Sequence, residues 1–435
     1  MRARMRLACA GCAVAAFGWA PMGAFGPMPL RGQARPGGTP SVFRQFGERV
    51  VKIEISESGS AAKASLGSGF FVSAGGDVIT NYHVVAQIVH DPDRYRARII
   101  NAAGDTLGAT LLAIDVVHDL ALVRSSAPPS AWFTLRAATP DQGDRLFSLG
   151  HPRDLGLSIV EGTYNGLLRH TLYPKIHFTG SLNPGMSGGP ALSASGDVIG
   201  INVSTEGNQV SFLVPADQAL ALLDRTRAAG FQPPTNFLDE AARQILAYQD
   251  IYLDRVFRTP VPTVTIGRFT LPTEPAPFFK CWADADRNPE QPYETVSHQC
   301  STDDYLYLSE DQASGLIELT HQVLTSSQLN RFRFYALYSN EFSSGDSPMW
   351  GDEEDVTSFR CVTRNVRRGV KGTLRTAFCA RRYRRMPGLY DVVVRAAALA
   401  TRNDGLVTTL TLAGVSYENA ERVARRFLES ISWTE

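Results

Sequence analysis

Short segments rich in β-branched and aromatic residues follow one another from Val50 to Val214, and this series limits the possible folds more than any other feature of the sequence. Turn signals such as Ala74–Asp77, Ala103–Asp105 and Ser195–Asp197 separate the segments at intervals that suit an all-β barrel or sandwich. No long helical pattern interrupts the series. The expected strands are Val50–Ile55, Gly67–Val72, Asp77–Thr80, Arg96–Asn101, Thr106–Ala113, Leu120–Arg124, Arg145–Leu149, Gly156–Tyr164, Lys175–Phe178, Ala191–Leu192, Val198–Val203 and Val210–Val214.

The rest of the chain has a mixed pattern. Because 435 residues exceed the about 100–200 residues typical of one domain, we expect at least two packed units. Helical periodicity covers 215–230, the stretch 231–235 with its two prolines is a short linker, and an amphipathic helix is expected over 236–256. The linker is short and stiff, so this helix should lie close to the first domain. The later expected elements are β segments at Val264–Leu271, Gly315–Val323, Arg331–Tyr338, Leu389–Ala397 and Leu406–Leu412, and a helix at Tyr417–Ser430.

The N-terminus has the charged, apolar and polar order of a secretory signal peptide. Its apolar run, Leu7–Ala20, is roughly 14 residues long, and no other segment reaches the about 18 needed to span a bilayer. We therefore expect an exported chain, periplasmic or secreted, without a transmembrane span in its mature form. An uncleaved anchor and a lipoprotein modified at Cys12 are the alternatives. The predicted division is a signal peptide at 1–26, a first domain at 41–230, a linker at 231–235 and an α+β domain at 236–435.

The charge balance excludes a global electrostatic attraction to polyanions. The 43 Lys and Arg against 43 Asp and Glu give a formal net charge of zero at pH 7, so we expect no nucleic-acid partner. Basic residues nevertheless cluster in the second half, and the acidic run Asp352–Asp355 precedes them. This cluster is either a solvated face or a site for an anion or envelope polymer. Its members are Arg364, Arg367, Arg368, Lys371, Arg375, Arg381, Arg382, Arg384 and Arg385.

Four cysteines remain once the predicted signal peptide is removed, and all of them lie in the second half of the chain. An even number of cysteines in an exported protein indicates disulfides. Three pairings are possible, and Cys281–Cys300 with Cys361–Cys379 is the favoured one. A zinc site is the rival, although no Cys-x-x-Cys spacing supports it.

Three segments in the β-rich part carry the residue types of nucleophilic catalysis. They are Gly67–Val85, which contains Thr-Asn-Tyr-His83, then His118–Val123, which begins His-Asp119, and Asn183–Pro190, which contains Gly-Met-Ser187-Gly-Gly. Together they resemble the trypsin-like serine proteases, most closely the HtrA (Deg) branch, over about Leu66–Leu223. The resemblance implies an all-β, chymotrypsin-like double β-barrel, followed here by the α+β domain, with an active site between the barrels and no cofactor.

The residues suit the chemistry that this resemblance implies. Ser187 needs a neighbouring imidazole to take its proton, and His83 needs a carboxylate to fix its tautomer, a role assigned to Asp119. Asp115 is the competing acid, but Asp119 alone opens the Leu-Ala-Leu-Val strand. By resemblance the oxyanion hole consists of the N–H groups of Gly185 and Ser187. The remaining histidines of this half are expected to be structural: His90, His118, His151, His170 and His177.

The resemblance also implies a substrate pocket without a charged group. Its floor falls at Ser181, where no carboxylate could pair with Lys or Arg, and Val210 narrows its wall. Met186 departs from the family, which has Asn or Asp there, so activation by an ion pair with a new N-terminus is impossible. A flexible Met at this position leaves the resting geometry of the oxyanion loop in question. The other expected wall residues are Val203, Ser204 and Thr205.

These observations predict an exported serine endopeptidase that acts on protein or peptide substrates, with a role in envelope protein quality control. The family usually carries a PDZ domain after the protease, and nothing after Thr235 shows one. The second domain is expected to contribute recognition, assembly or restraint, through an envelope or protein partner. The alternative is a catalytically inactive protease fold that serves as a binding or scaffold protein.

Overall fold

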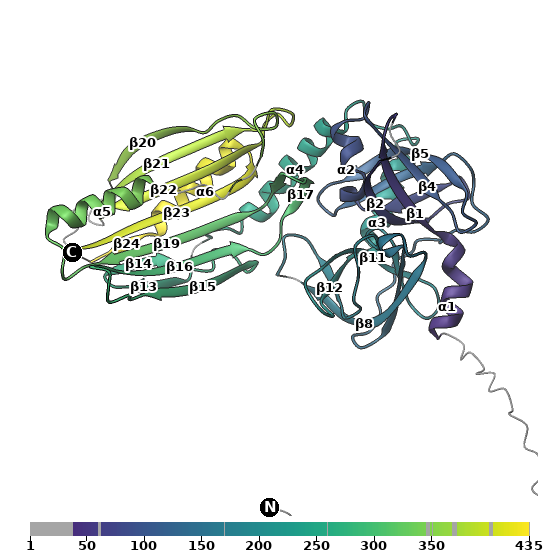
Figure 1. The fold of residues 1–435 in the computed structure, drawn as a ribbon, viewed down its shortest axis with the longest axis horizontal. Helices are drawn as coiled ribbons and strands as arrows, with labels where there is room; N and C mark the ends of the chain where they lie inside the picture. The colour runs from purple at the N-terminus through teal and green to yellow at the C-terminus, as the bar shows by residue number, and fades with distance from the viewer. Residues whose placement is uncertain are drawn as a thin grey trace, which may run out of the picture.

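A computed structural model describes residues 38–59, 62–168, 170–258, 260–344, 349, 351–367, 372–399 and 403–434 of the chain. The predicted signal peptide at 1–26, with Cys12, lies outside these residues, as do Arg368 and Lys371 of the basic cluster. The described residues form two barrels at one end of an elongated molecule and a large sheet at the other, with helix α4 between them (Figure 1).

Two closed, six-stranded antiparallel barrels confirm the predicted double-barrel fold. The first has the strand order β1-β2-β3-β6-β5-β4 and the second the order β10-β11-β12-β9-β8-β7. The strands of the first barrel are β1 (Val50–Glu57), β2 (Lys63–Phe71), β3 (Asp77–Thr80), β4 (Tyr95–Ile100), β5 (Thr106–Asp115) and β6 (Leu120–Ser125). Those of the second are β7 (Arg145–Gly150), β8 (Ser158–Leu168), β9 (Lys175–Phe178), β10 (Pro190–Leu192), β11 (Val198–Thr205) and β12 (Ser211–Pro215).

Short helices accompany the barrels. The helix α3 (Ala216–Ala228) is the one predicted at 215–230, whereas α1 (Thr39–Phe46), α2 (Tyr82–His90) and the 3-10 turns η1 (Gly47–Arg49) and η2 (Pro152–Asp154) were not predicted. The sequence did not predict α2, because the valines of this segment are also common in strands. Val84, Val85 and Val89 are buried, and the helix packs against the first barrel.

The second half contains a seven-stranded antiparallel sheet of order β15-β16-β19-β23-β22-β21-β20, with α4 (Phe237–Leu253), α5 (Arg331–Ser343) and α6 (Tyr417–Ser430). A three-stranded sheet, β13-β14-β24, and a hairpin, β17-β18, complete it. The strands are β13 (Thr263–Ile266), β14 (Phe269–Pro272), β15 (Phe279–Asp286), β16 (Glu294–Thr302), β17 (Leu306–Ser309), β18 (Gln312–Ser314), β19 (Ile317–Thr325), β20 (Arg360–Arg367), β21 (Thr373–Arg382), β22 (Tyr390–Ala398), β23 (Asp404–Val415) and β24 (Ser432–Trp433).

The predicted strand at Arg331–Tyr338 is wrong, because this segment is the first part of helix α5. Asn330 caps the helix by accepting a hydrogen bond from the Arg333 N–H at 3.0 Å. Phe334 and Tyr338 stand four residues apart and are the buried residues of the helix. That spacing is helical, but the aromatic composition of the segment favoured a strand.

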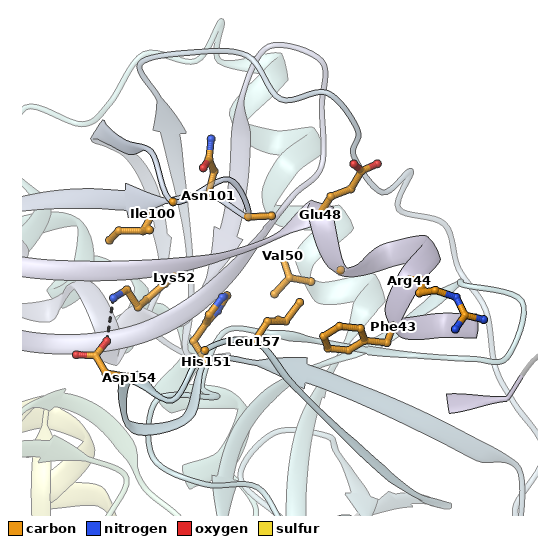
Figure 2. A pocket seen from close by; sticks show the side chains of 14 residues that line it. Phe43, Arg44, Glu48, Val50, Lys52, Ile100, Asn101, His151, Asp154 and Leu157 are labelled. Carbon is orange, nitrogen blue, oxygen red and sulfur yellow. Dashed lines mark hydrogen bonds and ion pairs between the residues drawn. The ribbon is translucent and has the colours of Figure 1, made fainter. Parts of the chain in front are cut away.

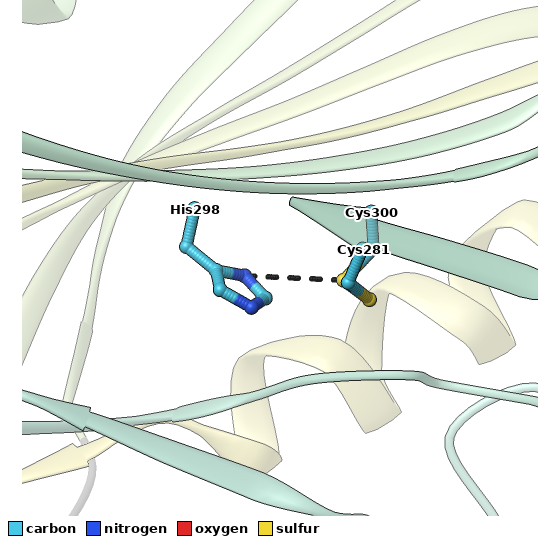
Figure 3. Close-up of side chains that lie close together, drawn as sticks. All are labelled: Cys281, His298 and Cys300. Atoms are coloured by element: carbon cyan, nitrogen blue, oxygen red, sulfur yellow. Dashed lines mark hydrogen bonds between the residues drawn. A yellow bond between two sulfur atoms is a disulfide. The ribbon is translucent and has the colours of Figure 1, made fainter. Parts of the chain in front are cut away.

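The disulfides Cys281–Cys300 and Cys361–Cys379 are the pairs that the sequence favoured. Each joins residues directly opposite one another in an antiparallel pair, β15–β16 and β20–β21. His298 lies beside the first disulfide, with Nδ1 3.9 Å from Cys300 Sγ (Figure 3). This trio does not suit zinc, which binds cysteine as the thiolate and not as a disulfide.

One apolar core extends from the first barrel into the second half of the chain. It contains Tyr82 and Val85 of α2, Ile245 and Tyr252 of α4, and Leu308 of β17. The helix α4 therefore packs against the barrels, as the short linker predicts. No helix among the described residues combines the length and the apolar character needed to cross a bilayer.

Candidate active site

The helix α2 places His83 beside Asp119. The His83 backbone N–H donates to Asp119 Oδ1 at 2.9 Å, and His83 Nδ1 lies 2.6 Å from Asp119 Oδ2. Asp119 has a left-handed backbone, with φ of 53°. Its carbonyl oxygen accepts hydrogen bonds from Asn81 Nδ2 at 2.7 Å and from the Tyr82 N–H at 3.2 Å, and these contacts hold the strained turn.

The electrostatics around His83 favour a basic imidazole. Burial alone would lower the pKa of His83, but the Asp119 carboxylate and its hydrogen bond oppose this effect, and the net pKa is raised above the usual value of 6.5. The carboxylate also fixes the tautomer with the proton on Nδ1. The Nε2 lone pair is then the one that can accept a proton.

Asp115, the competing acid, faces other groups. One of its carboxylate oxygens lies 3.0 Å from His118 Nδ1 and the other 3.0 Å from an Arg225 nitrogen. Burial would raise the pKa of Asp115, but the hydrogen bond from His118 and the nearby Arg225 charge lower it overall. The structure therefore brings Asp119, and not Asp115, to His83.

Ser187 stands on a tight loop between Asn183 and Pro190. Gly188 has a φ of 84°, and a Cβ atom there would lie 2.2 Å from the Ser68 carbonyl oxygen, so no other residue fits. The Ser187 carbonyl accepts a hydrogen bond from the Ser68 N–H at 2.7 Å. In the described part of the chain the His83 imidazole has its hydrogen bond with Asp119. Among the described residues no hydrogen bond joins Ser187 Oγ to His83 Nε2.

A hydrogen-bonded network around Ser68 supports the loop that carries Gly185 and Ser187, the predicted oxyanion donors. Ser68 Oγ donates to the Gly185 carbonyl at 2.7 Å and accepts from the His151 N–H at 2.8 Å. The Arg153 N–H donates to the Pro184 carbonyl at 3.1 Å. The carbonyl groups of Pro184 and Gly185, on either side of the Gly185 nitrogen, are thus both linked by hydrogen bonds to the loop that follows β7, the second through Ser68. Sequence reasoning missed Ser68, because its partners are backbone groups that no spacing encodes.

Asn202 and Met186 hold the loop from the other side. The fully buried Asn202 donates through Nδ2 to the Met186 carbonyl at 3.1 Å and to the Leu149 carbonyl at 3.2 Å, and its Oδ1 accepts from Ser148 Oγ at 2.8 Å. The Met186 side chain is fully buried and packs with Phe178 and other residues of the second barrel's core. The Met that replaces a polar residue of the family is therefore a core residue.

A cleft of about 670 Å³ opens beside His83 and Asp119. Three of the predicted pocket residues, Val203, Ser204 and Thr205, line it. Ser181 is exposed, with its Oγ 3.4 Å from Asn208 Oδ1, and the Val210 carbonyl accepts from Thr205 Oγ1 at 3.1 Å. Neither belongs to the cleft lining among the described residues. The second half of the chain supplies several lining residues that the sequence did not indicate: Phe278, Phe279, Asp304, Leu306 and Tyr307.

A second cavity of about 530 Å³ lies on another side of the loop that follows β7, against α1 (Figure 2). Figure 2 shows His151 and Leu157 in its lining, and Lys52 paired with Asp154 at 2.8 Å. Burial and then the Lys52 charge lower the pKa of His151 to about 4, so its imidazole is neutral near pH 7. The cavity lining does not include the predicted catalytic residues.

Comparison with known proteins agrees with this geometry. Residues 67–201 match the family described as "Trypsin-like peptidase domain". "Serine protease HTRA2, mitochondrial" of Bos taurus is 33% identical over 198 residues, which cover 42% of this chain and 42% of that protein. "Probable periplasmic serine endoprotease DegP-like" of Ectopseudomonas mendocina is 32% identical over 223 residues, or 47% of this chain and 45% of that protein.

Among solved structures, the serine endoprotease of Yersinia pestis is 24% identical, with a TM-score of 0.38, and the similarity covers 44% of this chain and 67% of that one. The chain thus spans less than half the length of the two curated relatives. Residues 67–201 of its double barrel match the trypsin-like peptidase domain, and this part of the chain is similar to the HtrA and DegP proteases.

Proposed function

We propose that the chain is an exported serine endopeptidase in which Ser187 is the nucleophile, His83 the general base and Asp119 the orienting acid. The contact of 2.6 Å between His83 Nδ1 and Asp119 Oδ2, on a trypsin-like double barrel, is the observation that carries the proposal. Ser187 follows in a glycine-rich loop, and its backbone N–H and that of Gly185 are the proposed oxyanion donors. The relatives named as serine proteases support the same reaction.

The proposed reaction is a two-step acyl transfer. Ser187 Oγ attacks the scissile carbonyl carbon while His83 Nε2 takes the hydroxyl proton, and the N–H groups of Gly185 and Ser187 stabilise the oxyanion. His83 then donates this proton to the leaving amine, which departs as the C–N bond breaks. Water, deprotonated by His83, attacks the acyl-enzyme, and the acid product leaves as Ser187 is protonated again.

We further infer that residues 41–230 form the catalytic unit and that the α+β domain at 236–435 covers one side of its cleft. The substrate would be a protein segment that lies extended beside β11, with the side chain preceding the cut near Val203–Thr205. The predicted leader and the word "periplasmic" in the name of the DegP-like relatives support a location outside the cytoplasm. Proteins of the cell envelope are the proposed substrates.

A serine-reactive fluorophosphonate probe, combined with casein cleavage, tests this proposal. The purified chain should react with the probe at Ser187 and cleave casein, whereas Ser187→Ala should do neither, with activity lower by about 10⁶-fold as in subtilisin. Ser193→Ala, in a partly exposed turn outside the cleft lining, is the matched control and should retain both activities. Casein cleavage by Ser187→Ala, or an unlabelled wild type, would refute the assignment and favour a scaffold role.

A further inference from the structure

The hairpin β17–β18 lies against α2, the helix that carries His83 (Figure 1). The Leu308 carbonyl in β17 accepts a hydrogen bond from the Tyr82 hydroxyl at 3.0 Å and another from His90 Nε2 at 2.9 Å. Tyr82 and His90 are the first and last residues of α2. One carbonyl group of the second domain therefore accepts hydrogen bonds from side chains at both ends of the helix.

A largely buried ion pair joins the adjoining segment to the second barrel. Lys175 Nζ in β9 lies 2.6 Å from Asp304 Oδ1, and the two side chains are 11% and 14% exposed. Lys280 pairs with Asp303 beside it. Since α2 packs on the first barrel and β9 belongs to the second, the segment 303–308 is attached to both sides of the cleft.

Tyr307 stands between these two attachments. In β17 the side chains of Leu306 and Leu308 are buried, and Tyr307 alternates with them and lines the cleft. Its ring centroid lies 6.0 Å from that of His83 in a T-shaped arrangement. A side chain of the second domain thus forms the wall of the cleft next to the imidazole.

We propose that Tyr307 is a specificity-determining residue, which narrows the subsite for the substrate residue two positions before the cut and selects a small side chain there. This inference rests on the proposed peptidase function. In an extended substrate, side chains alternate between opposite sides. If the residue before the cut points to Val203–Thr205, the one before it points toward the imidazole, where Tyr307 limits the space.

The expected preference follows from the geometry of the two rings. The T-shaped pair, with centroids 6.0 Å apart, leaves no gap between the rings, so a substrate side chain must lie beside them in the cleft that both line. Gly or Ala should fit there, and Leu or Phe should clash with the Tyr307 ring. A few additional methylene groups that do not fit reduce kcat/KM by about 10-fold or more. The second domain would then select substrates by the size of the side chain two positions before the cut.

The test compares two fluorogenic peptides that differ only in Ala or Leu at the second position before the cut. Wild type should prefer Ala by about 10-fold or more in kcat/KM, and Tyr307→Ala should bring the ratio close to one by admitting Leu. Tyr307→Trp should increase the preference for Ala, which keeps the proposal testable if the smaller variant fails to fold. Tyr307→Phe keeps the ring and should retain the wild-type ratio.

Phe332→Ala is the matched control, because Phe332 is an aromatic residue of the same domain that is 87% exposed on α5. Its ratio should equal that of wild type. Fluorophosphonate labelling of each variant separates the two proposals. An unlabelled wild type refutes the peptidase function itself. A labelled wild type whose Ala-to-Leu ratio is unchanged in Tyr307→Ala and Tyr307→Trp refutes only the role of Tyr307.

Discussion

At the scale of single residues, the two aspartates near the site have separate partners, and this difference can be tested directly. Asp119→Asn should lower kcat by about 10⁴-fold, because an amide stabilises the wrong imidazole tautomer. Asp115→Asn should leave kcat within about 10-fold of wild type, since its partners are His118 and Arg225. It should lower the melting temperature instead, because a buried charged contact is worth about 1–3 kcal/mol. Equal losses of kcat would contradict the assignment of Asp119.

The raised pKa of His83 predicts a pH dependence with a definite sign. The proposed peptidase reaction needs the neutral imidazole, so kcat/KM should rise with pH, with a midpoint above 6.5. The protonated pair with Asp119 stabilises the fold below pH 6.5, and this contribution is lost as pH rises through the folded-state pKa. Proton NMR titration of His83 in Ser187→Ala protein measures this pKa. Asp119→Asn in the same background should bring it below 6.5, because burial then acts alone.

We expect Ser68 to be a positioning residue that acts through the backbone of Gly185. Ser68→Ala removes the hydroxyl that joins the Gly185 carbonyl to the His151 N–H, and the oxyanion loop should then be less well held. We expect kcat to fall by about 10-fold or more, below the 10²–10³-fold for loss of a whole oxyanion donor, with little change in KM. Steady-state kinetics of Ser68→Ala, with Ser193→Ala as the control variant, measures kcat and KM separately. A rise in KM at constant kcat would indicate a substrate contact instead.

The candidate catalytic residues that the sequence indicates all belong to local motifs. His83, Asp119 and Ser187 each stand in a short segment whose neighbours are characteristic, so the amino-acid sequence alone identifies them as candidates. Ser68 and Asn202 could not be identified in this way, since each acts through hydrogen bonds to backbone groups that are far away in the chain. Tyr307 could not be predicted either, because its ring contact with His83 joins residues that are far apart in the chain.

At the scale of elements, the two disulfides occupy different places and should differ in function. Each disulfide joins an edge strand of the sheet to its neighbour, but at opposite edges. Cys281 in β15 follows Phe279 and Lys280, which line the cleft, whereas none of the described residues of β20 or β21, which Cys361 and Cys379 join, lines it. Each closes a loop of comparable length, so each should contribute about 3 kcal/mol to stability. Replacing Cys281 and Cys300 by Ser should therefore reduce both the melting temperature and kcat/KM.

The matched variant replaces Cys361 and Cys379 by Ser. It should lose comparable stability while its kcat/KM at 25 °C stays close to that of wild type, because β20 is exposed along most of its length. Thermal unfolding and peptide cleavage, measured on both double variants, compare the two bridges. Loss of activity in the Cys361 and Cys379 variant alone would mean that the edge hairpin has a function.

Helices and strands were predicted correctly where the spacing of apolar residues fits only one kind of secondary structure. The helix α6 begins and ends at the predicted residues, 417–430, since its apolar positions recur with a helical period. The edge strand β20 was missed because nearly all of its residues are exposed and many are charged. Charged residues on an edge strand discourage pairing with other chains, which accounts for part of the basic cluster in the described residues.

At the scale of the whole molecule, the linker suggests two separable domains, but the apolar core does not divide there. In helix α4, Gln244 Nε2 donates to the Ile114 carbonyl at 2.9 Å, and the Tyr248 hydroxyl donates to the Leu172 carbonyl at 2.6 Å. Tyr82, which precedes His83, has no exposed surface and lies in the core shared with α4 and β17. The second domain therefore covers apolar surface of the barrels that would otherwise face water.

A chain that ends at Phe231 tests this dependence. It would expose Tyr82, Val85 and Tyr173, with a cost of about 1.5–3 kcal/mol for each large apolar side chain. The shortened chain should therefore melt well below the full chain, tend to aggregate, and react with fluorophosphonate much more slowly, because α2 loses the Leu308 carbonyl that ties both of its ends. Tyr82→Phe in the full chain, which removes one of these hydrogen bonds, should cost about 1 kcal/mol and slow labelling only slightly. A monomeric shortened chain with the melting temperature and labelling rate of the full chain would instead mean that the barrels fold and position His83 by themselves.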